Sequence, residues 1–117
     1  MDKTKILITG NEGFIGQHLF TYLQQQGHEV VGFDKVNNLN LLNYNLINET
    51  ISQFKPEVVI HLASTVSNEI EKCKEDILST LNLMEVCKIN DVKRFFFTSS
   101  AAVYGESFPN ILPINPY

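Results

Sequence analysis

The sequence is short of the features that mark membrane, nucleic-acid-binding and repeat proteins. It has no run of about 18 or more apolar residues, so we expect neither a membrane span nor a membrane partner. Nine Lys and Arg residues are scattered among 13 Asp and Glu residues, which leaves a net charge of −4 and no basic patch for nucleic acid. Since neither a signal peptide nor an internal repeat is recognisable, we expect a single domain located in the cytoplasm.

The sequence also has few cysteines, and the two present, Cys73 and Cys87, fall in one predicted helix. At a rise of about 1.5 Å per residue, the 14 positions between them correspond to roughly 21 Å. A disulfide requires Cα atoms within about 7 Å of each other, so these two cysteines cannot form one. We also predict that the chain has no metal site.

Three evenly spaced glycines near the start are the most informative feature that is present. Gly10 and Gly13 separate a predicted buried strand, residues 5–9, from a predicted amphipathic helix, residues 14–26, which contains Gly16. Gly10 permits a tight turn, Gly13 leaves room for a pyrophosphate and Gly16 lets the helix lie close to the strand. Free N–H groups at the helix N-terminus stabilise an anion. The spacing therefore predicts a dinucleotide-binding turn, in preference to an ordinary strand-to-helix turn.

An acidic residue follows the second predicted strand, where a ribose ligand is expected. Gly27 ends the helix, residues 29–33 form the strand, and Asp34 closes it about 20 residues beyond the glycines. The Asp34 carboxylate would accept hydrogen bonds from the adenosine ribose and repel a 2′-phosphate. This favours NAD over NADP, although the neighbouring Lys35 leaves NADP open.

The rest of the chain continues to alternate between apolar runs and helical periodicity. We predict a short strand and turn within residues 35–43, a helix over 44–54, a buried strand over 58–63, a long helix from 68 or 69 to 90, a fully buried strand over 92–98, and a surface loop from 99 to 117. This alternation predicts an α/β fold, a doubly wound parallel sheet of the Rossmann type with strand order 3-2-1-4-5.

Four separated motifs resemble those of one family, the extended short-chain dehydrogenases that act on nucleotide sugars, also called the NAD-dependent epimerase/dehydratase family. Residues 9–16 are similar to the family's cofactor turn, with Asp34 at its ribose-binding position. Residues 61–64, His-Leu-Ala-Ser, resemble its strand-four motif beside the cofactor. Residues 99–105 resemble the segment with the catalytic serine, and residues 114–117 resemble the approach to its catalytic Tyr-x-x-x-Lys.

The resemblance implies roles for individual residues. Ser100 would hold the sugar hydroxyl, and Tyr117 would act as the base. The residues implied to bind NAD are Gly10, Gly13, Phe14, Ile15, Gly16, Asp34, Leu62, Ala63 and Ser64.

The chain also departs from the family pattern. The partner lysine would stand four positions after Tyr117, so residues 1–117 are expected to be the NAD-binding N-terminal portion of a longer protein, without the substrate-binding domain and inactive alone. Asp76 stands where the family has Asn. Because the strand around Phe96 would lack its normal covering, we expect a homo-oligomer.

Several alternatives stay open. The implied parent activity is a nucleotide-sugar epimerase, and the alternatives are an NAD(P)-dependent keto-sugar reductase or a non-catalytic nucleotide-binding module. A dehydratase is disfavoured because Ala101 and Ala102 cannot transfer protons. Asn40 would either contact adenine or only stabilise its turn. His61 fits a hydrogen-bonded core residue better than a catalytic base.

Overall fold

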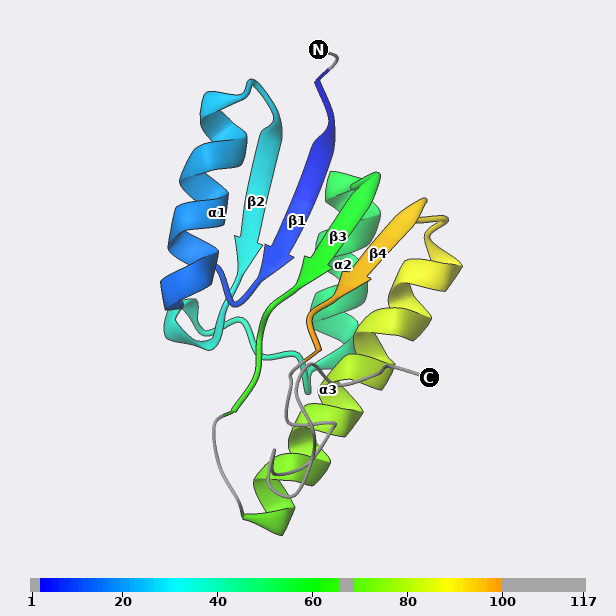
Figure 1. Ribbon diagram of the computed structural model, residues 1–117. Coiled ribbons are helices and arrows are strands. Elements are labelled where there is room, and N and C mark those ends of the chain that lie inside the picture. Colours follow the sequence, from blue (N-terminus) through cyan, green and yellow to red (C-terminus); the bar gives the residue numbers. More distant parts are fainter. Residues whose placement is uncertain (1–2, 66–68, 100–117) are drawn as a thin grey trace, which may run out of the picture.

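The computed structural model describes residues 3–65 and 69–99, which form a parallel sheet with helices on both faces (Figure 1). The elements are β1 (Lys5–Thr9), α1 (Phe14–Gln25), β2 (Glu29–Phe33), the 3-10 helix η1 (Lys35–Asn37), α2 (Tyr44–Phe54), β3 (Val58–His61), α3 (Ile70–Ile89) and β4 (Arg94–Phe97). The strand order is β2-β1-β3-β4, and every neighbouring pair is parallel. The predicted α/β class is therefore confirmed.

One predicted strand is wrong. Residues 35–43 form η1 and turns, so the sheet has the predicted order without the strand expected beyond β2. Local side chains explain the difference, because Asp34 accepts a hydrogen bond from the Val36 N–H and Asn40 accepts one from the Leu42 N–H. Asn38 adopts a left-handed conformation with φ of 63°. These local bonds occupy the backbone in turns, which leaves it unavailable to a sheet.

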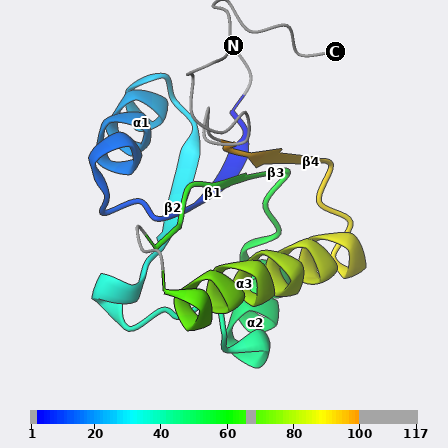
Figure 2. The same ribbon diagram turned by 60° about the horizontal axis from the view of Figure 1, so that its bottom comes forward.

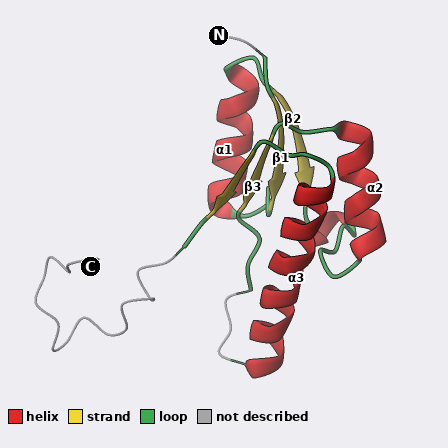
Figure 3. Ribbon diagram, turned by 90° about the vertical axis from the view of Figure 1, so that its right-hand side faces the viewer, coloured by secondary structure: helices red, strands yellow, loops and turns green. Residues whose placement is uncertain are grey.

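The core has two layers, one on each face of the sheet. Figures 2 and 3 show α1 covering one face, with α2 and α3 on the other. On the α1 face, Ile6, Ile8 and Val30 are buried. The buried cluster on the α2 and α3 face is larger and consists of Leu7, Phe33, Leu41, Ile47, Ile51, Val59, Leu83, Val86 and Cys87. The alternation along β1 therefore places successive apolar residues into opposite core layers.

The strand β4 is less buried than predicted. It pairs with β3 and lies at the edge of the four-stranded sheet, and Phe96 and Phe97 are 52% and 59% exposed. Phe95 alone of the three packs partly against the larger core cluster. The prediction of a fully buried strand is wrong for the described residues, since the apolar run does not specify which neighbours cover it.

Both cysteines lie on α3, and no disulfide joins them, as predicted. Burial raises the pKa of the Cys87 thiol to about 12, so this thiol stays protonated. None of the helices in residues 3–65 and 69–99 is long and apolar enough to cross a membrane.

Candidate dinucleotide-binding site

The glycine turn after β1 is closed by backbone hydrogen bonds and close contacts. The Gly10 N–H donates to the Phe33 carbonyl at 3.0 Å, and the Gly13 N–H donates to the Gly10 carbonyl at 3.1 Å. Gly10 has φ of 72°, and a Cβ there would lie 2.8 Å from the Ala63 nitrogen. A Cβ on Gly16 would collide with the Gly10 carbonyl. The predicted tight turn and close helix approach are therefore present in the structure.

The turn residue Asn11 is seated over β2. Its side chain occupies the space that a Cβ on Gly32 would take, so glycine at position 32 makes room for it. Asn11 is 9% exposed, and its amide nitrogen donates to Glu12 Oε1 at 3.3 Å. Its amide oxygen is buried without a hydrogen-bond partner among the described residues. Packing against Gly32 thus couples the turn to the strand that leads to Asp34.

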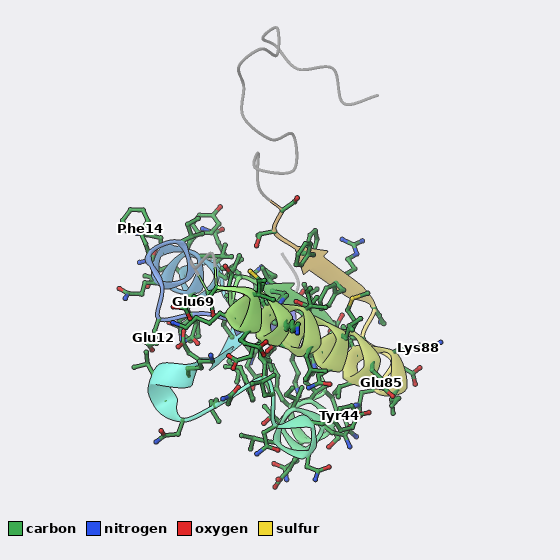
Figure 4. The ribbon with its side chains drawn as sticks, turned by 90° about the horizontal axis from the view of Figure 1, so that it is seen from below. Glu12, Phe14, Tyr44, Glu69, Glu85 and Lys88 are labelled. Carbon is green, nitrogen blue, oxygen red and sulfur yellow. The ribbon has the colours of Figure 1, made fainter. Side chains whose placement is uncertain are left out.

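The Asp34 carboxylate is held in place by two backbone N–H groups. Oδ2 accepts from the Glu12 N–H and Oδ1 from the Val36 N–H, both at 3.0 Å. Because an ionised carboxylate has about four acceptor positions, each oxygen can accept another bond from a ribose hydroxyl. Asp34 therefore links the glycine turn to η1 and stays available to a ligand. Figure 4 looks onto this edge of the sheet and shows Glu12 on the rim, between the start of α1 and η1.

A chain of hydrogen bonds connects the ends of β1 and β3 to α3. Thr9 Oγ1 accepts from the N–H groups of Leu62 and Ala63, both at 3.1 Å, and lies 2.6 Å from His61 Nδ1. With its lone pairs used, the Thr9 hydroxyl donates its hydrogen to Nδ1. His61 Nε2 then carries the ring hydrogen and donates to Thr80 Oγ1 at 2.9 Å. β3 ends at His61, so Leu62 and Ala63 lie beyond it, although the strand was predicted to extend over residues 58–63.

His61 is a neutral, hydrogen-bonded core residue, as favoured from the sequence. It is 2% exposed, and burial lowers its pKa below the ordinary value of 6.5. The negative charge of Asp76 opposes this effect in part. The Thr80 hydroxyl, in turn, donates to the Asp76 carbonyl, which completes the chain from β1 to α3.

Two cavities adjoin this edge and share a wall made of Ala63, Ser64 and Asp76. The smaller, about 120 Å³, is lined by Asp34 and Lys35 together with apolar side chains of Phe33, Leu39 and Leu41. The larger, about 430 Å³, is lined by His61, Ile77, Thr80, Leu81 and residues 97–99. The Asp76 carboxylate accepts from the Thr65 N–H at 2.9 Å and so fixes the loop between the cavities.

The structure brings most of the predicted binding residues together at one edge of the sheet. Phe14 and Ile15 are exposed on the first turn of α1, and Phe14 points away from the sheet (Figure 4). The Leu62 side chain instead packs into the α1-side core layer, leaving its backbone facing Thr9. Ser100 and Tyr117 lie outside the described residues. Asn40 uses its side-chain oxygen for its own turn, which is one of the two alternatives.

Thr9, Asn11 and Glu12 fall within the predicted cofactor turn, residues 9–16, but no individual contact was predicted for any of them. All three stand within or beside the glycine pattern, but their partners lie elsewhere in the chain. Thr9 is 52 residues from His61, and Glu12 is 22 residues from Asp34. Their place in the turn of residues 9–16 was the only signal that the sequence offered for them.

Comparisons with known proteins agree with this architecture. The model of the NAD dependent epimerase/dehydratase family matches residues 6–117. The chain belongs to this family. Within the family, a putative UDP-glucose 4-epimerase of Methanocaldococcus jannaschii is 34% identical over 94% of this chain and 42% of that protein. A UDP-glucose 4-epimerase of Klebsiella pneumoniae is 30% identical over 87% of this chain and 93% of that protein.

A solved member of the epimerase/dehydratase family has the same fold. The crystal structure of UDP-glucose 4-epimerase from Bifidobacterium longum in complex with NAD+ and UDP aligns with a TM-score of 0.82 and 28% identity. The alignment covers 97% of this chain and 41% of that one. The chain spans about 40% of the length of several curated relatives.

Proposed function

We propose that this chain binds NAD and is the cofactor-binding part of a nucleotide-sugar epimerase. The observation that carries the proposal is the Asp34 carboxylate, which is held by the Glu12 and Val36 N–H groups beside the glycine turn. This arrangement presents fixed acceptors to the two hydroxyls of an adenosine ribose. The smaller cavity, with apolar walls of Phe33, Leu39 and Leu41, adjoins Asp34 and suits the adenine ring.

The pyrophosphate would lie at the N-terminus of α1. The first helical N–H groups have no partner within a helix, and the first turn of α1 contains no acidic side chain. Gly13 caps the helix without a side chain, so a phosphate can approach the backbone. The positive end of the helix dipole adds a favourable interaction with the anion.

The larger cavity would hold the nicotinamide and the sugar. When bound, NAD would supply the hydride acceptor and donor for a sugar carbon. Ser99 lines this cavity and precedes Ser100 in the sequence, which supports Ser100 as the residue that holds the sugar hydroxyl. We assign Tyr117 as the base that removes the hydroxyl proton, on the strength of its position in the family motif.

Calorimetry with three ligands tests the proposed cofactor site. We expect ADP-ribose to bind within about tenfold of NAD, roughly 1.4 kcal/mol, and nicotinamide mononucleotide to bind far more weakly. Asp34→Ala should weaken NAD and ADP-ribose alike by about tenfold or more, because a charged hydrogen bond to the ribose is lost. Glu49→Ala, on the exposed face of α2, is the matched control. Tight binding of the mononucleotide, or an unchanged affinity of Asp34→Ala, would contradict the proposal.

A further inference from the structure

A second carboxylate stands at the adenosine end of the site. The Glu12 N–H donates to Asp34 Oδ2 at 3.0 Å, so the residue that follows Asn11 in the turn is directly adjacent to the predicted ribose ligand. In the described parts of the chain, neither Glu12 nor Asp34 takes part in any of the three ion pairs. The two negative charges are therefore uncompensated by a paired cation.

The Glu12 carboxylate is held on the β2 side of the turn. Asn11, seated over Gly32, donates its amide hydrogen to Glu12 Oε1 at 3.3 Å. The Glu12 carbonyl accepts from the Gln17 side chain at 2.7 Å, which fixes the backbone of the turn to α1. Because Gly32 lies two residues before Asp34 on the same segment, these contacts hold the Glu12 carboxylate on the side where Asp34 lies.

The charges around the smaller cavity are also mainly negative. Its charged lining residues are Asp34, Lys35 and Asp76, and Glu12 adjoins Asp34 at the rim. Lys35 is the one basic side chain among the described lining residues. Because Asp76 lies on the wall shared with the larger cavity, the carboxylates of Asp34 and Glu12 against the one ammonium group of Lys35 leave this end of the cavity electronegative. A ribose hydroxyl is compatible with that field, whereas a phosphate monoester, with a charge of about −1.5 to −2 at neutral pH, is repelled.

We propose that Glu12 is a specificity-determining residue that, together with Asp34, rejects dinucleotides with a phosphate on the adenosine 2′-hydroxyl. The inference rests on the proposed cofactor site. It adds Glu12, inside the glycine turn, as a second determinant of cofactor specificity beside Asp34 at the end of β2. Glu12 acts through its charge, because its side chain is exposed while its backbone N–H and carbonyl are already bonded to Asp34 and Gln17.

Binding of ADP-ribose and of its 2′-phosphate to the purified chain tests the inference. We expect Glu12→Gln to improve the affinity for the 2′-phosphate by about threefold to tenfold, because one repulsive charge a few ångströms away is removed. The affinity for ADP-ribose itself should change by less than about twofold, since the backbone N–H that holds Asp34 is retained. Glu12→Lys should improve the affinity for the 2′-phosphate further.

Two controls separate a local charge effect from other causes. Glu85→Gln removes the same charge near the far end of α3 (Figure 4) and should leave the ratio of the two affinities unchanged. Raising the salt concentration to about 1 M, where the Debye length is about 3 Å, should shrink the effect of Glu12→Gln. If ADP-ribose binds but Glu12→Gln leaves the ratio unchanged, the inference is overturned while the proposed function stands. If ADP-ribose does not bind the unaltered chain, both are overturned.

Discussion

Thr9 connects several parts of the site, because its one hydroxyl forms hydrogen bonds with the Leu62 N–H, the Ala63 N–H and the His61 ring. We predict that Thr9→Val, which keeps the shape but removes the hydroxyl, lowers the free energy of unfolding by at least about 2 kcal/mol. The part-buried Ala63 N–H and the buried His61 Nδ1 would both lose their partner. Urea unfolding measures the change.

Two further variants separate this effect from a general preference for threonine. Thr9→Ser keeps the hydroxyl and should recover most of the stability. Thr21→Val, on the exposed side of α1, should change the free energy of unfolding by less than about 0.5 kcal/mol. A loss of equal size in Thr21→Val would refute the assignment to the Thr9 network.

His61 makes stability depend on pH. Its folded-state pKa lies below 6.5 because of burial, so the unfolded chain binds more protons than the folded one once the pH falls through 6.5. We predict that the free energy of unfolding decreases from pH 6.5 downward, at no more than about 1.4 kcal/mol per pH unit from this group, until the folded pKa is reached.

Urea unfolding between pH 5 and 7.5 measures this pH dependence in the unaltered chain and in two matched variants. His61→Gln should lose this part of the dependence. His18→Gln, at an exposed position on α1, should retain it. Identical profiles for the unaltered chain and His61→Gln would show that the pH effect has another origin.

Sequence reasoning located Asp34 but not the bonds that hold it. The acid was predictable because its distance from the glycines is set by the length of one helix and one strand. Its partners Glu12 and Val36, and the link between Thr9 and His61, arise only when separate strands are brought side by side in the sheet. No local pattern in the sequence encodes such pairings.

Among the elements, α2 was predicted with the right limits, whereas the segment before it was not. The helix starts where the Asn43 side chain accepts from the Leu46 N–H. It ends at Phe54, before Lys55, which adopts a left-handed conformation and precedes Pro56. These are local stop and start signals. In residues 35–43 the alternating leucines favoured a strand. Instead, the side chains of Asp34 and Asn40 accept hydrogen bonds from backbone N–H groups of this segment, which stabilises turns.

The helix α3 shows what periodicity leaves open. Its existence was predicted from apolar residues at helical spacing, but the stripe that the structure buries contains Ser79, Leu83, Val86 and Cys87. Ile77, Leu78, Leu81, Met84 and Ile89 are exposed. Apolar residues occur on more than one face of α3, so the sequence could not specify which face meets the sheet.

The contact between Asn11 of the glycine turn and Gly32 of β2 can be tested with a pair of substitutions. We predict that Gly32→Ala destabilises the fold, because its methyl group would collide with the Asn11 side chain. Asn11→Ala should remove the collision and also remove the unpartnered amide oxygen. In a double-mutant cycle measured by urea unfolding, the double variant should be more stable than Gly32→Ala alone. Additive effects would mean that the two residues do not interact.

At the scale of the whole molecule, the exposed edge of the sheet predicts self-association. β4 pairs with β3 within the described residues, and Phe96 and Phe97 are more than half exposed. Open strand edges with apolar side chains pair readily with other chains. We predict dimers or larger assemblies by sedimentation, shifted toward monomer by Phe96→Lys but not by Tyr22→Lys, which alters an exposed aromatic residue of α1. A monomer across a wide concentration range would contradict this.

The central position of β1 in the sheet has a consequence for synthesis on the ribosome. β1 is made before the other described strands, yet its pairing with β3 requires His61, 52 residues after Thr9. At about 5 to 20 residues per second, one side of this strand stays without a partner for about 3 to 10 s. Its apolar residues Ile6, Leu7 and Ile8 are buried in the finished fold but open to solvent during that interval. The nascent chain is thus most prone to aggregate before β3 emerges.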